Sequence, residues 1–310
     1  MEKVSYEVGV RADVRSETNV VSVGKPPWTS VPHNGKLERM ILQLGAGKGE
    51  FSELYGIPRS VGCIGNNRFL LRREPLSRER LYSLVEEFKA LGGSELWLTN
   101  YDDVGTLLDV ATYARDIGVD EVYAVVLLGD VDEVIPVDGV RFVAELRYSP
   151  ENIERVLSYP WLHGALIVTE PEKLDDVLRD AALIPGEVYV DVLFPRSARR
   201  LNFNVIELRR IFNPSVEKYH DCLAGTIAVT ADGYLLPCPL LRNYVIVDLK
   251  EKSLRSALRK KRLRDFWKMT KDSIPSCSKC PFKYLCHDCR ALEYQATGEI
   301  DGMEYCPMLL

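Results

Sequence analysis

The sequence of 310 residues is 46% hydrophobic and 27% charged, and its formal net charge is -5. This composition is ordinary for a globular protein and excludes a disordered chain or a coiled coil. No apolar run reaches the roughly 18 residues that cross a bilayer, and the first ten residues lack the apolar core of a signal peptide. We therefore expect a cytoplasmic protein with no membrane contact.

Residues 1–36 predict a strand-bearing extension followed by a linker. Hydrophobic and polar residues alternate from position 4 to position 14, as they do in a half-buried strand. The stretch VGKPPWTSVPHNG then brings three prolines and two glycines, which interrupt any regular element.

Residues 37–215 alternate apolar runs of strand length with helical patterns. The six runs are RMILQL, ELWLT, VYAVVLL, RFVAEL, GALIVT and EVYVDVLF. Helices are predicted behind Ser77, a good N-cap residue, and at Ser149-Pro150 and Glu170-Pro171. Apolar strands joined by single helices indicate a parallel sheet in an α/β fold. Six units favour a partial, TIM-like (β/α)6 barrel over the alternative, a doubly wound sheet. In either fold the site is expected at the carboxyl ends of the strands.

Residues 216–310 end this alternation and contain seven of the eight cysteines. These are Cys222, Cys238, Cys277, Cys280, Cys286, Cys289 and Cys306. Because a reducing cytoplasm disfavours disulfides, bound metal is the expected reason for the enrichment. Gly233 lies where a turn between two short strands would need a positive φ. The region is predicted to be a small second domain that depends on metal to fold.

The spacing of the cysteines bears on which metal they bind. Two C-x2-C pairs, Cys277 with Cys280 and Cys286 with Cys289, can each direct two thiolates at one site. Three of the seven cysteines precede proline, a habit of ferredoxin-type ligands. Two structural zinc sites are the alternative, although zinc ribbons usually place more than five residues between their pairs. The spacing favours iron–sulfur clusters.

The complete pattern resembles the SPASM domain of radical SAM enzymes. It reads C-x10-G-x4-C, then C-x2-C-x5-C-x2-C, then a final cysteine, and departs from the family only in x2 for x3 before Cys289. The resemblance implies two auxiliary [4Fe-4S] clusters. Their implied ligands are Cys222, Cys238 and Cys289 for the first cluster, and Cys277, Cys280, Cys286 and Cys306 for the second. The first cluster then lacks a fourth thiolate, for which His220 and Asp221 are candidates.

The motif that defines radical SAM enzymes, C-x3-C-x2-C after the first barrel strand, is missing. Cys63 is the only cysteine of that loop. A metal ligand and a reactive thiol are alternatives, but because burial is the commonest fate of a free cysteine, we interpret it as an inert buried residue. If it were the second motif position, the other two would be Arg59 and Asn66. The resemblance thus implies the family's fold with a degenerate, lost SAM cluster. We do not expect S-adenosylmethionine to be bound and cleaved by the usual route.

The second strand also departs from the family. It should end in a sequence like Gly-Gly-Glu-Pro, which contacts the cofactor, but it ends in Asn100, Tyr101, Asp102 and Asp103. The two acids are either a catalytic or metal-binding pair or, more commonly, a favourable start for the helix near Val104.

Positive charge is concentrated between Lys250 and Lys271, where ten Lys or Arg and two acids give a net charge of +8. Hydrophobic residues at helical spacing predict an amphipathic helix with a solvated basic face. That face would offset the negative charge of thiolate-bound clusters, or bind an acidic protein or peptide. No other nucleic-acid-binding pattern accompanies it, so nucleic acid is not an expected partner.

Three hypotheses follow for function, and none assigns a catalytic residue. The leading one is an iron–sulfur protein, related to SPASM-type radical SAM enzymes, that has lost the SAM cluster. It would act in electron transfer, substrate binding or scaffolding, as the partner of a complete radical SAM enzyme that modifies a peptide or a tetrapyrrole. The second is an enzyme that uses the open first cluster. The third is a zinc-containing interaction module without redox activity.

Overall fold

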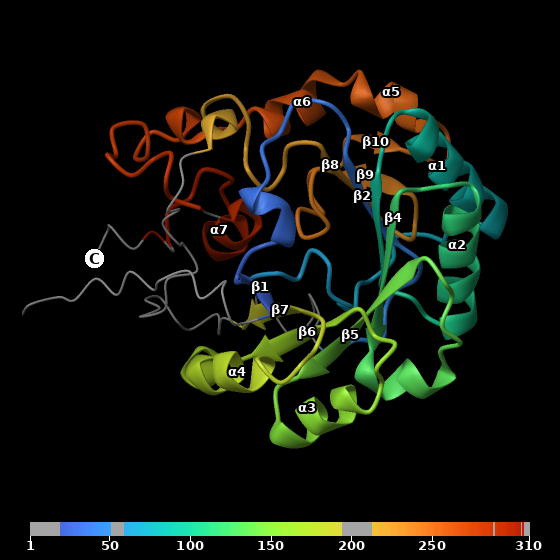
Figure 1. Ribbon diagram of the computed structural model, residues 1–310. Coiled ribbons are helices and arrows are strands. Elements are labelled where there is room, and N and C mark those ends of the chain that lie inside the picture. The colour runs from blue at the N-terminus through green and yellow to red at the C-terminus, as the bar shows by residue number, and fades with distance from the viewer. Residues whose placement is uncertain (1–18, 51–58, 194–212, 288, 305, 307–310) are drawn as a thin grey trace, which may run out of the picture.

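The computed structural model describes residues 19–50, 59–193, 213–287, 289–304 and 306. The strand predicted at residues 4–14 lies outside these ranges. One sheet crosses the described part of the chain, in the order β1-β7-β6-β5-β4-β3-β2-β8-β9-β10 (Figure 1). Its strands are β1 Val20–Val23, β2 Arg39–Gln43, β3 Glu95–Thr99, β4 Glu121–Leu127, β5 Val140–Arg147, β6 Gly164–Thr169, β7 Glu187–Val192, β8 Thr226–Val229, β9 Tyr234–Leu236 and β10 Val247–Asp248.

Strands β2 to β7 are parallel and follow one another across the sheet in chain order. A doubly wound sheet would reverse its strand order at a switch point. The observed order confirms the partial barrel and excludes that alternative. The sheet also continues across both predicted domain boundaries, because β1 pairs with β7 and β8 pairs with β2, each in parallel. The division at residues 36 and 215 stays a prediction.

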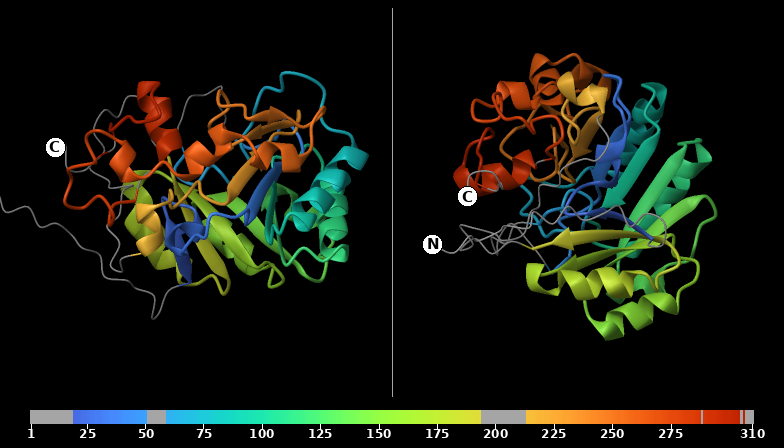
Figure 2. Two further views of the ribbon diagram at one scale, coloured as in Figure 1. Left: turned by 90° about the horizontal axis from the view of Figure 1, so that it is seen from above. Right: turned by 60° about the vertical axis from the view of Figure 1, so that its left-hand side comes forward.

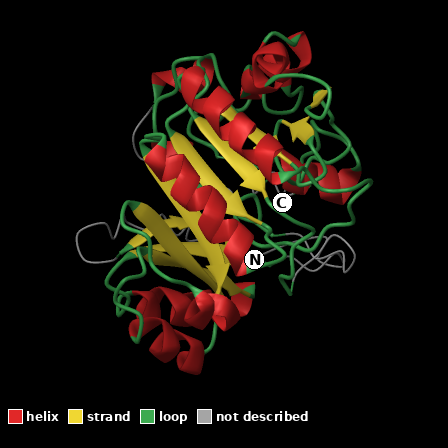
Figure 3. Cartoon of the chain, turned by 90° about the vertical axis from the view of Figure 1, so that its right-hand side faces the viewer, coloured by secondary structure: helices red, strands yellow, loops and turns green. Residues whose placement is uncertain are grey.

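Four α-helices lie on the outer face of the barrel sheet (Figure 3). They are α1 Arg78–Ala90, α2 Val104–Asp116, α3 Pro150–Leu157 and α4 Leu174–Ala181. Ser77 and Ser149 cap α1 and α3, and each accepts a hydrogen bond from the backbone N–H three residues later. The predicted cap at Ser77 is confirmed, and α3 begins at Pro150 as predicted. No helix of the described residues is both long enough and apolar enough to cross a membrane.

Two connections differ from the predicted single helices. Strands β4 and β5 are joined by a 3-10 helix, η2 Leu128–Glu133, because Pro136 and Gly139 follow within the same short connection and prevent a longer helix. The helix predicted at Glu170-Pro171 starts with a 3-10 turn, η3 Pro171–Lys173, before α4 begins.

The strands alternate side chains between an outer core beneath the helices and an inner core on the concave face. In the inner core, Trp97 of β3 stacks on Tyr123 of β4, with ring centroids 4.1 Å apart. Tyr189 of β7 meets Trp97 edge-on at 5.8 Å. Aromatic rings therefore fill the middle layer of the concave face, and the polar residues of a site are left to the layer above, at the carboxyl ends of the strands.

The C-terminal region lies against this concave face (Figure 2). Besides β8, β9 and β10, it contains η4 Pro214–Glu217, α5 Leu254–Leu258, α6 Lys261–Trp267, η5 Lys271–Ser273 and α7 Arg290–Thr297. Gly233 has a φ of 88° in the turn between β8 and β9, as predicted. The basic stretch forms two short helices, α5 and α6, because the chain is extended at Lys260. Its apolar residues point inward as expected, and Leu254 and Leu263 are buried.

Candidate metal centre

The three cysteines expected to bind the first cluster come together around the β8–β9 hairpin. Cys222 precedes β8, Cys238 follows β9, and Cys289 is the residue immediately before α7. All three pack in the inner core, where Cys222 and Cys238 are 8% and 6% exposed. A fourth cysteine, Cys63, packs in the same core and is 6% exposed. The structure thus gathers four thiols from four separate segments.

The charges of these four thiols act on one another. Burial raises the pKa of Cys222 well above its ordinary value, and Cys63, Cys289 and Cys238 raise it further. Burial likewise raises the pKa of Cys63, with added contributions from Cys238, Cys289 and Asp191. Four buried cysteines of this kind become thiolates only beside a cation, and the donor set fits a metal cluster, to which cysteine binds as thiolate.

The backbone around these sulfurs also suits a bound cluster. Burial raises the pKa of Cys238 to about 12, whereas N–H groups of Leu240 and Leu241 hydrogen-bond the sulfur and lower it. Hydrogen bonds to ligand sulfurs are one means by which proteins tune cluster potentials. Cys289 stands at the N-terminus of α7, where the helix dipole favours a thiolate.

The cysteines expected to bind the second cluster follow tight turns in a region with little regular structure. The N–H of Cys280 donates to the carbonyl of Cys277 at 2.9 Å, and the N–H of Cys286 donates to Phe282 at 2.8 Å. The sulfur of Cys277 lies 3.2 Å from the sulfur of Met303, which brings the segment that ends in Cys306 beside the first C-x2-C pair. Of these four cysteines, Cys277 is buried and the others are partly exposed.

A contact between Asp221 and His287 connects the cysteines expected to bind the first cluster with those expected to bind the second. Nδ1 of His287 lies 2.6 Å from the Asp221 carboxylate. Asp221 directly precedes Cys222 and His287 directly follows Cys286, so this contact joins a neighbour of the first set to a neighbour of the second. Nδ1 of His220 accepts the N–H of Cys222 at 3.0 Å and lies 3.2 Å from Asp221. His220 and Asp221 therefore support the turn at Cys222; their predicted role as fourth ligands stays a prediction.

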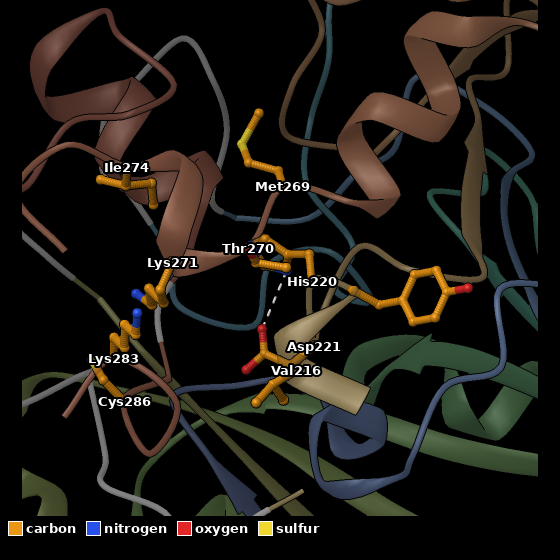
Figure 4. Close-up of a pocket in the computed structure, with 10 residues that line it drawn as sticks. Val216, His220, Asp221, Met269, Thr270, Lys271, Ile274, Lys283 and Cys286 are labelled. Carbon is orange, nitrogen blue, oxygen red and sulfur yellow. Dashed lines mark ion pairs between the residues drawn. The ribbon is translucent and has the colours of Figure 1, made fainter. Parts of the chain in front are cut away.

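A pocket beside Asp221 and Cys286 is small. Its volume is about 20 Å³, which is room for about one water molecule. Figure 4 shows Lys271 and Lys283 together beside Cys286, with His220 and Asp221 paired on another wall. A larger hollow of about 610 Å³ lies at the amino ends of β1 and β7, the end of a barrel that rarely carries chemistry.

The mouth of the barrel is filled by the chain's own loop. Nε of Arg59 donates to Asp191 at 2.6 Å, and its Nη1 donates to Glu145 at 2.9 Å. All three side chains are no more than 4% exposed. Burial alone would lower the pKa of Arg59, but the two carboxylates raise it above its ordinary value. Burial raises the pKa of Glu145, an effect that Arg59 opposes. A closed ion-pair network thus occupies the end of the barrel where a site was expected.

The four residues that end the second barrel strand take part in local structure. The amide of Asn100 hydrogen-bonds the backbone of Asn67. The hydroxyl of Tyr101 donates to Asp130 at 2.6 Å. Asp102 accepts the N–H of Gly47 at 3.0 Å. Asp103 accepts the N–H of Thr106 and caps α2, which confirms the interpretation of this acid as a helix start.

Two features were not predicted from the sequence: the ion pairs of Arg59, and the packing of Cys63 in the same buried core as Cys222 and Cys238. Glu145 and Asp191 offered a signal, since each is an acid that interrupts the apolar run inside its strand. For Cys63 the signal was the number of cysteines. Seven of the eight were assigned to the two expected clusters, the first cluster lacked a fourth ligand, and Cys63 was the one cysteine left unassigned. Within the described residues, no three His, Cys, Asp or Glu side chains converge on the position of a single metal ion.

Comparison with known proteins identifies the class of the C-terminal region. Residues 222–281 match the SPASM family, described as an iron-sulfur cluster-binding domain. The predicted resemblance is confirmed for this segment, which includes four of the seven cysteines. Among solved structures, SuiB of Streptococcus suis, crystallised with S-adenosylmethionine, is similar with a TM-score of 0.49 and 11% identity. The similarity covers 85% of this chain and 73% of SuiB. A search of curated proteins found no match.

Proposed function

We propose that this chain is an iron–sulfur protein with two [4Fe-4S] clusters in its C-terminal region and no SAM cluster at its barrel mouth. The observation that carries the proposal is the contrast between the two places. Cysteines gather on the inner core side of β8 and β9, whereas Arg59, Glu145 and Asp191 close the mouth. When bound, such clusters accept and donate single electrons.

We assign the protein a role as an electron-transfer or substrate-binding partner, because buried ion pairs of Arg59 with Glu145 and Asp191 lie at the barrel mouth, where the SAM cluster of a radical SAM enzyme would be expected. Its partner would be a complete radical SAM enzyme or a precursor peptide, in the modification of a peptide or a tetrapyrrole. The surface of α5 and α6 supports a protein partner, since its basic side chains face solvent while its apolar ones are buried. These exposed residues are Arg255, Arg259, Lys260, Lys261, Arg262, Arg264 and Lys268. An acidic surface would complement them.

The loss of SAM chemistry is tested by adding S-adenosylmethionine and dithionite to the anaerobically reconstituted protein. We expect no 5'-deoxyadenosine above a protein-free control, because no C-x3-C-x2-C motif is present. Formation of the product in catalytic amounts would contradict the proposal and favour an active enzyme. A colourless protein with stoichiometric zinc after anaerobic purification would instead favour the zinc-containing module.

A further inference from the structure

Cys63 is part of the barrel region of the sequence, but in the structure it packs near the cysteines of the SPASM region. It lies in a turn after β2, far along the chain from the nearest of the other cysteines. Nevertheless it packs in the same buried cluster as Cys222 and Cys238, with Cys289 against that cluster. Four thiols in one buried place are the donor set that a [4Fe-4S] cluster needs.

The turn that carries Cys63 is held rigidly. The N–H of Ile64 donates to the carbonyl of Val61 at 3.1 Å and closes the turn. The N–H of Val61 donates to Asp191 at 2.9 Å, and the backbone of Ser60 pairs with Val192 at the end of β7. Val61 and Ile64 are fully buried. A ligand position fixed in this way is preorganised, which is what a metal site requires of its supporting residues.

Asp221 and Nδ1 of His220, the groups beside Cys222, are engaged in the turn at Cys222. Asp221 accepts the N–H of Cys222 at 3.0 Å and holds His287 with its other oxygen. Nδ1 of His220 accepts the N–H groups of Cys222 and Leu223. Cys238 and Cys289 also lie close enough to Cys63 to interact with it electrostatically: burial raises the pKa of Cys63 most, and these two cysteines raise it further.

We propose that Cys63 supplies the fourth thiolate of the first cluster, with Cys222, Cys238 and Cys289, so that the cluster joins the barrel to the SPASM region. This inference rests on the proposed function, because it requires that the first cluster exists. It replaces the interpretation of Cys63 as inert. It also closes the coordination of that cluster, which removes the open iron on which the alternative enzyme hypothesis depends.

The test isolates the first cluster and then removes Cys63. The background is the full chain with Cys280→Ala and Cys286→Ala, two partly exposed positions of the second set. In this background Cys63→Ala is compared with Cys63→Ser, which keeps an oxygen ligand, and with Val61→Ala. Val61→Ala is a matched control, because it shortens a buried side chain of the same turn and removes no sulfur atom. Far-UV circular dichroism verifies that each variant is folded.

Each protein is reconstituted with iron and sulfide under argon and treated with one equivalent of ferricyanide. An iron without a protein thiolate leaves as Fe²⁺ when the cluster loses one electron to ferricyanide, and a paramagnetic [3Fe-4S] cluster remains. We expect this EPR signal, and the release of about one iron per chain, in Cys63→Ala. The background and Val61→Ala should keep all their iron, and Cys63→Ser should release less than Cys63→Ala.

Two failures are distinguishable. Equal iron release and equal EPR spectra in Cys63→Ala and the background would overturn the role of Cys63 and leave the proposed function standing. A background protein that binds no iron, together with an unaltered chain that binds none, would overturn the proposed function itself. A folded Cys63→Ala variant that binds no cluster at all, beside a normal Val61→Ala control, would support Cys63 as a ligand.

Discussion

Asp103 stabilises the start of α2 through two hydrogen bonds to one residue. Its carboxylate accepts the N–H of Thr106 at 2.7 Å and the hydroxyl of Thr106 at 2.8 Å. These bonds hold the pKa of Asp103 below its ordinary value. The side chain is exposed, so its effect belongs to the helix end and not to the core.

Replacing Asp103 with alanine should lower the free energy of unfolding by about 1 kcal/mol at neutral pH, the usual cost of losing an N-cap. Asp103→Asn should retain most of the stability. Because the folded-state pKa is lowered, the charged cap contributes above the unfolded pKa of about 4 and is lost as the pH falls through the folded value. Urea unfolding of both variants between pH 7 and about pH 2 measures this. A constant difference that persists well below pH 4 would contradict the charged cap.

Arg59 is the only cation in contact with two buried carboxylates in the network at the barrel mouth, as far as the described residues show. Arg59→Met would leave Glu145 and Asp191 buried without that charge. We expect a loss of about 3 to 5 kcal/mol of unfolding free energy, as for other broken buried pairs. Arg59→Lys should lose less, since it keeps the charge but not the two-pronged geometry.

The loss in Arg59→Met should depend on pH with a definite sign. Burial raises the pKa of Glu145, and a carboxyl whose folded pKa is raised favours folding at low pH and loses that contribution as the pH rises through the folded value. The variant should therefore be less destabilised at pH 5.5 than at pH 8. Urea unfolding of Arg59→Met and the unaltered protein at pH 5.5 and pH 8 measures this difference. A larger loss of unfolding free energy at pH 5.5 than at pH 8 would contradict the expected sign.

At the scale of elements, the barrel strands could be predicted because each is a continuous apolar run with a clear boundary. The run EVYVDVLF, for example, becomes β7, Glu187–Val192. The connection between β4 and β5 was mispredicted because the pattern of neighbouring helices was extended over Pro136. The gathering of four thiols could not be predicted, since periodicity defines elements and says nothing about how the loop at Cys63 folds back.

The β8–β9 hairpin that separates Cys222 from Cys238 depends on Gly233. Its φ is 88°, and a Cβ there would lie 2.8 Å from the side chain of Leu76. Gly118 has a φ of 81° but open space around its Cβ position, so it is a matched control for the backbone effect alone. Gly118→Ala should cost about 1 kcal/mol, and Gly233→Ala should cost more. Equal losses in urea unfolding would show that the contact with Leu76 carries no strain.

At the scale of the whole molecule, one sheet serves both regions. Strand β8 continues the parallel sheet of the barrel, while the segment from Cys277 to Cys289 has no helix or strand among its described residues. The barrel part of the sheet is supported by a large apolar core, whereas we propose that the segment from Cys277 to Cys289 depends on metal bound to its cysteines. The two regions should therefore respond differently to the loss of metal.

Removing the metal with a chelator under reducing conditions should loosen residues 277–289 and the turn at Cys63, and leave β3 to β6 protected. Hydrogen exchange followed by mass spectrometry compares the two forms of the same chain. A uniform increase across the barrel strands would contradict the expectation that the barrel core is stable without metal. No change around Cys63 would also weaken its proposed link to the first cluster.

The central claim, a barrel without a SAM cluster joined to a region with two clusters, is tested most directly by counting iron and acid-labile sulfide. The measurement is made per chain on the anaerobically reconstituted protein. Two cubane clusters predict about eight irons and about eight sulfides. About twelve of each would reveal a third cluster and contradict the claim, as would about four of each or zinc in place of iron.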